Sequence, residues 1–346
     1  MTVLLRGSGL GISACAHVLG KAGIPFRAEP LRRRPVPVIM LSDAALALLR
    51  DVFERPGLLA HKPRIARRVV RWGASEAVAM PHGAIVVSEE ELASALEPEN
   101  PPSPALEASN TPAAFAPARP VAGEFTIHAA APFPVQAMQR FGHRRSTAAR
   151  VRLVREAEPA TCWIESVADG WLFLVPDGEG AAWLLAVGSV PETLAGQSRM
   201  IAGLIAEIAP ASGSFDTCPR MLAGMAGDGW LACGMSAIAF DPICGDGTAQ
   251  TAREAILACA VIAALRRGED AASLATHYHS MLLASMRRHL QLSLPFYGEG
   301  GTGTWWRHQY EAARAGYDWC TAKLGALPPP RFALHGFDLV PRELAA

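Results

Sequence analysis

Residues 2–29, TVLLRGSGLGISACAHVLGKAGIPFRAE, contain a short apolar run, a glycine turn and a run of small residues. The spacing predicts a strand over residues 2–6, a helix over 13–22 and a second strand over 25–29. A strand, a glycine turn, a helix and a strand in this order make up a dinucleotide-binding βαβ unit. The opening thirty residues therefore indicate an α/β fold.

The glycine turn is the first candidate binding site. Glycines permit a tight turn and a close approach of the backbone, and the free N–H groups at a helix start bind phosphate. We expect four residues to contact a pyrophosphate: Gly7, Ser8, Gly9 and Gly11. Glu29 ends the next strand, where a carboxylate can accept hydrogen bonds from a ribose. The third glycine of G-x-G-x-x-G falls on Ile12, and a turn that only packs a strand against a helix is the alternative.

The next segment continues the α/β pattern. Ser42 is placed to cap a helix over residues 43–53, and a further helix is predicted over 89–96. Strands are predicted on either side of Pro81, over residues 68–72 and 84–88. Residues 97–122 hold seven prolines and are predicted to form an exposed loop.

The second half of the chain changes character twice. Runs rich in Val, Ile, Trp and Phe, separated by Asp-Gly or Gly-Glu-Gly turns, predict antiparallel strands over 149–154, 160–167, 170–175 and 181–187. Helical periodicity follows over 248–267, 270–294 and 304–324. The proline-rich tail is expected to be irregular.

A second glycine turn lies more than two hundred residues after the first. Residues 230–250 read WLACGMSAIAFDPICGDGTAQ, an apolar strand followed by Asp241-Pro242 and by Gly245-x-Gly247 at the start of a long helix. A nicotinamide dinucleotide gives no reason for a second turn of this kind, whereas a flavin does. The alternative is a loop and a helix start in a core without a cofactor.

In these two turns, in residues 169–176 (DGWLFLVP) and in the aromatic segment 296–319, the sequence resembles the flavin-dependent monooxygenases of the para-hydroxybenzoate hydroxylase fold. It looks most like the branch that contains flavin-dependent halogenases and the monooxygenases that modify a partner polypeptide during quinone-cofactor biogenesis. The resemblance implies a Rossmann-like FAD-binding domain, an inserted antiparallel-sheet substrate domain and C-terminal helices. It also implies FAD as the cofactor, with NAD(P)H or a partner flavin reductase as the electron source.

The resemblance assigns cofactor contacts to the second turn. In the family, the backbone of D-P-x-x-G-x-G contacts the isoalloxazine ring, and the next helix points its N-terminus at N1 and the C2 carbonyl. Backbone N–H groups and a helix dipole stabilise the negative charge of reduced flavin there. This role transfers to Asp241, Pro242, Gly245, Gly247 and Thr248.

Two further positions are compared with the family's FAD contacts. The Gly-Asp pair that precedes the second turn in the family corresponds to Gly234 and Met235, so the aspartate contact to the ribityl or pyrophosphate region has no counterpart. Arg33 follows the second strand and is a candidate contact for the FAD phosphates or for NADPH. Exposed loop charge is the alternative for Arg33.

Three residues are candidates for the substrate side: His82, Trp171 and Phe173. His82 is expected in a loop after Pro81, and the two aromatic residues alternate along a strand. The alternatives are a surface or structural histidine and ordinary sheet packing. The aromatic residues within 305–319 are expected either to wall a substrate site or to pack helices together.

The halogenase branch differs from this chain at two features. It carries G-W-x-W-x-I-P, in which Phe173 and Val175 replace the second Trp and the Ile here. It also requires a catalytic lysine, and the three lysines, Lys21, Lys62 and Lys323, lie elsewhere in the sequence. The sequence therefore disfavours halogenation and favours a monooxygenase, which needs a dry, orienting pocket rather than a protein nucleophile.

The amino-acid composition indicates which classes of partner to expect. The 346 residues are half hydrophobic, and 32 basic side chains balance 32 acidic ones, so we expect a large folded core and no nucleic-acid partner. Seven scattered cysteines without a C-x-x-C pair argue against a disulfide framework and a metal site, and favour the cytoplasm. We find no signal-peptide pattern, and the apolar run 255–265 is too short to span a bilayer, so no membrane association is expected.

We predict a discontinuous FAD-binding domain over residues 1–96 and 215–268, a proline-rich loop over 97–122, an antiparallel-sheet substrate domain over 123–214 and a C-terminal helical cap over 269–346. The predicted function is FAD-dependent hydroxylation of an aromatic substrate, either small or presented by a peptide or carrier. The alternatives are a binding protein of the same fold without redox activity, motivated by Ile12 and Met235, a halogenase-like enzyme, and an FAD dehydrogenase or reductase that does not activate O₂.

Overall fold

The computed structural model describes residues 1–31, 33–97, 123–130, 133, 135–154, 157–178, 180–211, 213–245 and 247–342. Its α-helices are α1 (Leu10–Lys21), α2 (Asp43–Val52), α3 (Glu89–Leu96), α4 (Pro191–Ala195), α5 (Gly247–Arg266), α6 (Ala271–Glu299) and α7 (Thr304–Gly325). The predicted helices over 43–53 and 89–96 are confirmed, and Ser42 caps α2 by accepting a hydrogen bond from the backbone N–H of Ala45. All but the first residue of the predicted proline-rich loop lies outside the described residues.

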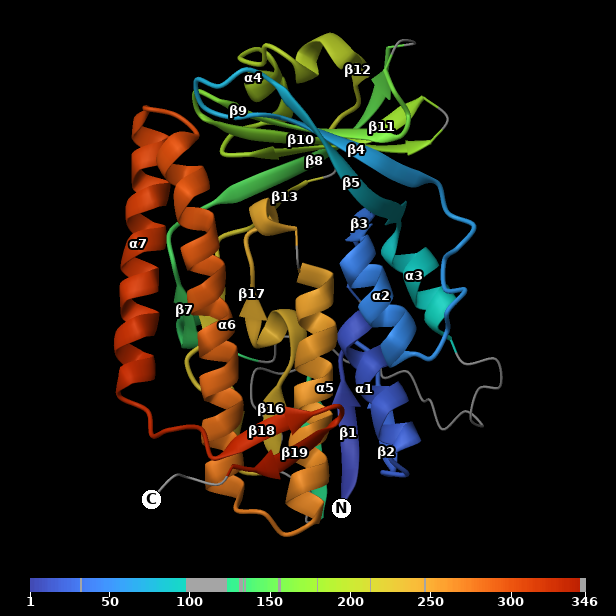
Figure 1. Cartoon of the computed structure of the whole chain (residues 1–346), viewed down its shortest axis with the longest axis vertical. Helices are drawn as coiled ribbons and strands as arrows, with labels where there is room; N and C mark the ends of the chain where they lie inside the picture. Colours follow the sequence, from blue (N-terminus) through green and yellow to red (C-terminus); the bar gives the residue numbers. More distant parts are fainter. Residues whose placement is uncertain are drawn as a thin grey trace.

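A five-stranded sheet forms one end of the molecule, at the bottom of Figure 1. Its order is β15 (Ala226–Gly227), β16 (Trp230–Ala232), β6 (Glu124–His128), β1 (Thr2–Arg6) and β2 (Phe26–Glu29). Strand β1 is parallel to β2 and β6, so the predicted βαβ unit is confirmed. Val3 and Leu5 of β1 share one buried core with residues of α1 and α5.

A larger sheet forms the opposite end. Its strands follow the order β12 (Ile205–Ile208), β8 (Arg145–Leu153), β11 (Ala181–Val187), β10 (Gly170–Gly178), β9 (Thr161–Val167), β4 (Arg64–Arg71), β5 (Val78–Val87) and β3 (Ile39–Ser42), with β13 (Ser214–Asp216) also pairing with β8. The pairs from β12 to β9 are antiparallel, as predicted, whereas β9 and β4 are parallel. After the domains that the sequence predicts, we call this larger sheet the substrate sheet, and we call the five-stranded sheet, with the helices packed on it, the nucleotide sheet and nucleotide half.

Sheet membership differs from the expected division of the chain at two places. Strands β3, β4 and β5 belong to the substrate sheet, although they lie within 1–96, and β6 belongs to the nucleotide sheet, although it lies within 123–214. Apolar runs predict strands but carry no information about which strand they pair with.

The structure also corrects the expectation around Pro81. Two short strands were expected on either side of it, but β5 continues through Pro81. Pro81 pairs with Arg67 at the point where the register between β4 and β5 shifts, and a proline is tolerated at such an irregularity. His82 therefore lies on a strand rather than in a loop.

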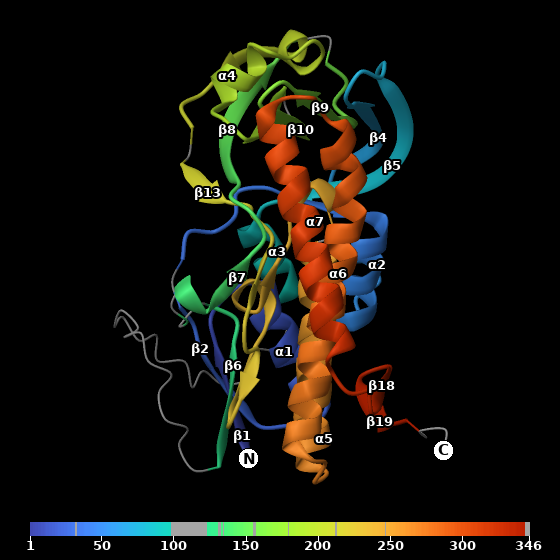
Figure 2. The same ribbon diagram turned by 90° about the vertical axis from the view of Figure 1, so that its left-hand side faces the viewer.

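Helices α6 and α7 pack side by side and run along the molecule from the nucleotide sheet to the substrate sheet (Figures 1 and 2). The tail after α7 was expected to be irregular, but it forms a hairpin of β18 (Phe332–His335) and β19 (Asp338–Pro341). The remaining small sheet has the order β17 (Ile238–Ala239), β14 (Arg220–Leu222) and β7 (Met138–Arg140).

Helix α5 occupies the middle of the nucleotide half. By length and composition it is the one helix of the described residues that could cross a bilayer, and it is longer than the expected apolar run. However, 72% of its apolar window is buried inside the molecule, which is typical of a core helix.

Candidate cofactor and substrate site

The first glycine turn has the backbone conformation that only glycine adopts readily. Gly7 has φ 137° and Gly9, the N-cap of α1, has φ 82°. A β-carbon at Gly7 would lie 2.9 Å from the backbone N of Ala130, so the close approach also requires glycine. Gly11 is buried, and a β-carbon there would lie 3.4 Å from Thr251 of α5. Gly11 therefore allows α1 to pack closely on α5.

Each of the two charged candidates beside this turn is paired with another charged residue. Glu29 ends β2 and accepts a hydrogen bond from Arg6 at 3.1 Å. Arg33 forms a bidentate ion pair with Glu89, the first residue of α3. A β-carbon on Gly9 would lie 2.6 Å from Glu89 Oε1 and 2.8 Å from Arg33 Nη2, so this ion pair lies directly over the turn. Sequence reasoning identified Arg33 and missed Glu89.

Gly234 lies before the second turn, with φ 62°. Its backbone N–H donates a hydrogen bond to Glu254 of α5 at 2.8 Å. Glu254 is fully buried, and this burial raises the pKa of its carboxyl to about 8. Met235, in contrast, is 60% exposed. The sequence signal for Glu254, a single acidic residue within an apolar helix, was not used.

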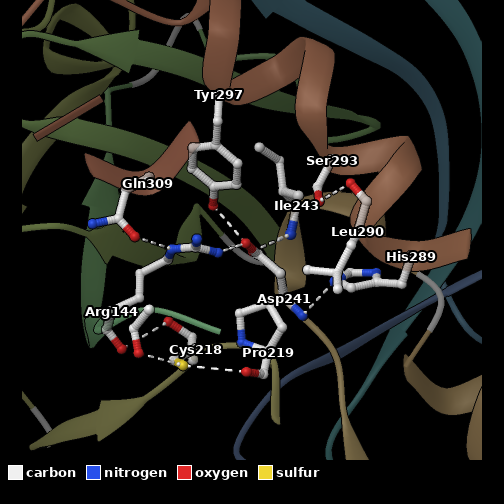
Figure 3. Close-up of polar contacts among 12 residues, drawn as sticks. Arg144, Cys218, Pro219, Asp241, Ile243, His289, Leu290, Ser293, Tyr297 and Gln309 are labelled. Carbon is white, nitrogen blue, oxygen red and sulfur yellow. Dashed lines mark hydrogen bonds and ion pairs between the residues drawn. The ribbon is translucent and has the colours of Figure 1, made fainter. Parts of the chain in front are cut away.

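Asp241 is turned into the protein, as Figure 3 shows. Its carboxylate forms an ion pair with Arg144 and accepts hydrogen bonds from the Tyr297 hydroxyl at 2.5 Å and from the Ile243 backbone N–H at 3.0 Å. The Arg144 guanidinium lies 4.1 Å from the centre of the Tyr297 ring and donates to Gln309 at 2.9 Å. Asp241 is 2% exposed, so its carboxylate holds the turn from the protein interior.

His289 of α6 holds the backbone of the same turn. Its Nε2 accepts a hydrogen bond from the Asp241 backbone N–H at 3.0 Å, and its ring stacks on Phe240 at 4.3 Å. Burial, followed by the nearby charge of Arg144, lowers the pKa of His289 to about 3. The ring is therefore neutral and remains an acceptor. Nothing in the local sequence around Arg144 or His289 indicates this role.

The turn itself exposes its backbone. Pro242 begins the short 3-10 helix η4 (Pro242–Cys244), and Gly245 ends it with φ 63°. At Gly245 and Gly247 an added β-carbon would meet no atom of the described residues within 4 Å. Thr248, half-buried, follows in the first turn of α5. Gly245 and Gly247 are exposed, so the start of α5 is open to a ligand, and free backbone N–H groups at a helix N-terminus can bind an anionic group.

Aromatic side chains of the substrate sheet and of α6 and α7 meet this turn. The group consists of Trp171, Val187, Tyr297 and Trp306, packed with Trp72, Ile164, Phe173, Leu185, Ile243 and Trp305. Ile243 of the second turn packs against this group, which also contains Trp171 and Phe173, two of the residues predicted for the substrate side. Trp306 is anchored by donating its indole N–H to the Val167 carbonyl at 2.8 Å. We call this group the aromatic wall.

The structure places His82 differently. Its Nε2 lies 2.8 Å from Arg68 on the neighbouring strand, and burial, followed by the charge of Arg68, lowers its pKa. The hydrogen-bond partner described for His82 is thus a structural arginine and not part of the second turn.

The three lysines of the chain have partners outside the aromatic wall. The described residues contain no group of three His, Cys, Asp or Glu side chains placed to hold a metal ion. Lys21 pairs with Glu54, Lys62 pairs with Glu91, and Lys323 lies over the Trp319 ring.

The two turns fit a flavin dinucleotide. Both are glycine turns in left-handed conformations that precede a helix N-terminus, and a β-carbon would meet neighbouring atoms at the first and open space at the second. The residues that would hold FAD are the backbone of Gly7–Gly11, of residues 241–245 and of Gly247 and Thr248, with Arg33 near the pyrophosphate. The carboxylate of Glu89, beside Gly9, opposes an anion there.

No family model and no curated protein sequence matches the chain. Among solved structures, the peptidyl tryptophan dihydroxylase QhpG, essential for tryptophylquinone cofactor biogenesis, is similar with a TM-score of 0.69 and 20% identity over 89% of this chain and 78% of its own. The flavin-dependent halogenase CmlS has a TM-score of 0.69 and 15% identity over 94% and 71%. A Klebsiella pneumoniae HpxO variant complexed with FAD has a TM-score of 0.56 and 15% identity over 94% and 98%. At these identities the likeness shows the fold alone, and the chain has the fold of the flavin-dependent monooxygenases and halogenases.

Proposed function

We propose that this protein is an FAD-dependent monooxygenase that hydroxylates an aromatic substrate. The observation that carries the proposal is the meeting of three features: the phosphate-type turn at α1, the second turn at the N-terminus of α5, and the aromatic wall that contacts Ile243 of that turn. When bound, FAD supplies the two-electron redox chemistry and the reaction with O₂.

The chain's own residues orient and shield the reactants. The N-terminus of α5 offers backbone N–H groups and a helix dipole to negative charge. Asp241, held by Arg144 and Tyr297, keeps this turn in place. The buried part of the aromatic wall excludes water, and its partly buried members, Trp72 and Trp305, can pack on a planar substrate.

The substrate is proposed to be an aromatic group carried by a peptide or carrier protein, with a free small aromatic as the alternative. Phe296, 41% exposed, packs edge-on against Trp72 at 5.9 Å and continues the aromatic wall to the surface. An exposed aromatic residue at the end of the wall can contact a side chain that a larger molecule presents. The structural likeness to a peptidyl tryptophan dihydroxylase is consistent with it. We propose a cytoplasmic protein, with NAD(P)H or a flavin reductase as the reductant.

A second candidate function, binding without redox chemistry, is favoured by a specific observation. The exposed side chain of Met235 and the Arg33–Glu89 ion pair over Gly9 both stand where an FAD enzyme needs contacts to the dinucleotide. A halogenase is disfavoured, because each of the three lysines is engaged at a place other than the aromatic wall.

The test is the absorption spectrum of the purified protein before and after adding FAD and removing the excess. Oxidised flavin bands at about 370 and 450 nm that survive desalting are the expected result, followed by O₂ consumption with NAD(P)H or a flavin reductase. A protein that stays colourless contradicts the proposal and favours the binding protein. Bleaching by substrate without oxygenated product would instead indicate a dehydrogenase.

A matched pair of glycine variants shows whether retained FAD uses the predicted turn. Gly9→Ala places a β-carbon at the phosphate turn, whereas Gly23→Ala introduces the same kind of left-handed strain after α1, at a residue with nothing within 4 Å. FAD retention should be lost in the first variant and kept in the second. Equal retention would place the cofactor elsewhere.

A further inference from the structure

The carboxylate of Glu89 lies beside Gly9, at the position where a phosphate group would bind to the first turn. The second glycine of a dinucleotide turn lacks a side chain so that the pyrophosphate can approach the backbone. In this chain the position beside Gly9 is within reach of Glu89 Oε1, 2.6 Å from where a β-carbon would be. The site that fits a phosphate group therefore already has an internal anion beside it.

Several contacts hold the Glu89 carboxylate in this place. It accepts two hydrogen bonds from the Arg33 guanidinium and one from the Val36 backbone N–H at 2.8 Å. Its side chain is only 13% exposed, against 40% for Arg33. The backbone of Glu89 is bonded as well, since its N–H donates to the Val36 carbonyl at 3.0 Å. The carboxylate is thus fixed over the turn rather than free in solvent.

The negative charge of Glu89 disfavours binding of a phosphate group at Gly9. A pyrophosphate carries two negative charges, and like charges a few ångströms apart repel strongly where solvent is partly excluded. The same geometry places Arg33, the cation that a pyrophosphate would use, in an ion pair with the competing carboxylate. FAD therefore has to displace Glu89 from the turn and exchange partners at Arg33.

We propose that Glu89 is an internal competitor for the FAD pyrophosphate site and sets the affinity of this protein for the dinucleotide. The proposal rests on the proposed function, since it concerns the same turn. Without ligand, Glu89 occupies Arg33 and covers the N-terminus of α1. With ligand, the carboxylate turns away and Arg33 transfers its hydrogen bonds to the phosphate oxygens.

The test compares Glu89→Gln with Glu90→Gln, using the full chain. Both residues lie in the first turn of α3, and both variants remove one negative charge from the same helix end, but Glu90 is exposed and has no described contact with Arg33. Affinity for FAD is measured by quenching of flavin fluorescence, and affinity for ADP, which carries the pyrophosphate without the flavin, by thermal shift. Unfolding in urea verifies that both variants fold.

The expected result is that E89Q lowers the dissociation constants of FAD and ADP by about tenfold or more. The dissociation constants of E90Q should stay within about twofold of those of the parent protein. Equal changes in the two variants, or no change in either, would overturn the proposal. If the parent chain fails to retain FAD and E89Q retains it, the internal competitor is supported while the proposed function of the parent chain fails. If neither variant binds FAD or ADP, both ideas are wrong.

Discussion

Glu254 is the buried acid whose ionisation the fold resists most clearly. Its carboxyl accepts hydrogen bonds from the Gly234 backbone N–H and from Gln250. The titratable groups that face it are Cys15, Cys233 and Tyr278, whose own pKa values are raised in this environment. With no cation among the causes of its shift, burial dominates and the pKa rises from 4.5 to about 8.

This shift predicts a loss of stability with rising pH. The unfolded chain releases the Glu254 proton near pH 4.5, whereas the folded chain retains it until about pH 8. The folded state therefore binds the extra proton between these values, and the free energy of unfolding falls as pH rises through this window, by on the order of 5 kcal/mol. Urea unfolding at about pH 5.5 and 8 should show that the free energy of unfolding of E254Q increases relative to that of the parent protein as pH rises. A pH-independent difference would contradict it, and exposed Glu311, replaced by Gln, is the control.

At the scale of elements, the terminal hairpin depends on a single buried aromatic residue. Phe332 of β18 is 4% exposed, belongs to the main core and meets the His277 ring edge-on at 5.7 Å. Phe337, between the two strands, is 38% exposed. The hairpin therefore packs on the main core through Phe332 and through Leu339, which is 1% exposed, and leaves Phe337 at the surface.

Replacing each phenylalanine by alanine compares a buried side chain of the hairpin with an exposed one. Phe332→Ala removes a core side chain, so we expect a loss of about 3 kcal/mol in the free energy of unfolding. Phe337→Ala should lose less than about 1 kcal/mol. Denaturation in urea measures both values. Similar losses would show that the hairpin is not anchored on the main core.

At the scale of the whole molecule, one buried ion pair joins the two ends. Arg144 immediately precedes β8 of the substrate sheet, Asp241 begins the second turn, and Tyr297 and Gln309 come from α6 and α7 (Figure 3). The Tyr297 hydroxyl remains protonated, because burial raises its pKa to about 12. Breaking this contact set affects the substrate sheet, the cofactor turn and the helices together.

Tyr297→Phe tests this junction, with Tyr317→Phe as the matched control. Tyr297 loses a hydrogen bond to a buried carboxylate, so we expect a loss of about 2 kcal/mol within one cooperative transition. Tyr317 also contacts an arginine, Arg287, at 4.5 Å, but it joins only α6 and α7 and is half-buried. Its loss should be smaller. Circular dichroism in urea measures both losses. Equal losses in the two variants would contradict a special role for the junction.

Local sequence patterns are sufficient to predict the secondary-structure elements and the class of fold. The strand, glycine turn and helix at residues 2–21, the cap at Ser42 and the long C-terminal helices follow from short-range patterns of glycine, polar caps and apolar periodicity. The second turn was found in the same way, because its glycines and its helix start are adjacent in the chain. Such features depend on neighbouring residues alone.

Which strands share a sheet and which side chains meet depends instead on the three-dimensional arrangement of the chain. The pairing of β4 with β9, the ion pair of Arg144 with Asp241 and the position of Glu89 over Gly9 all join residues far apart in sequence. Apolar alternation is satisfied by any partner strand, and a charged residue shows no sign in sequence of the partner that allows its burial. The turns could therefore be predicted from the sequence, whereas the groups that hold, cover and compete for them could not.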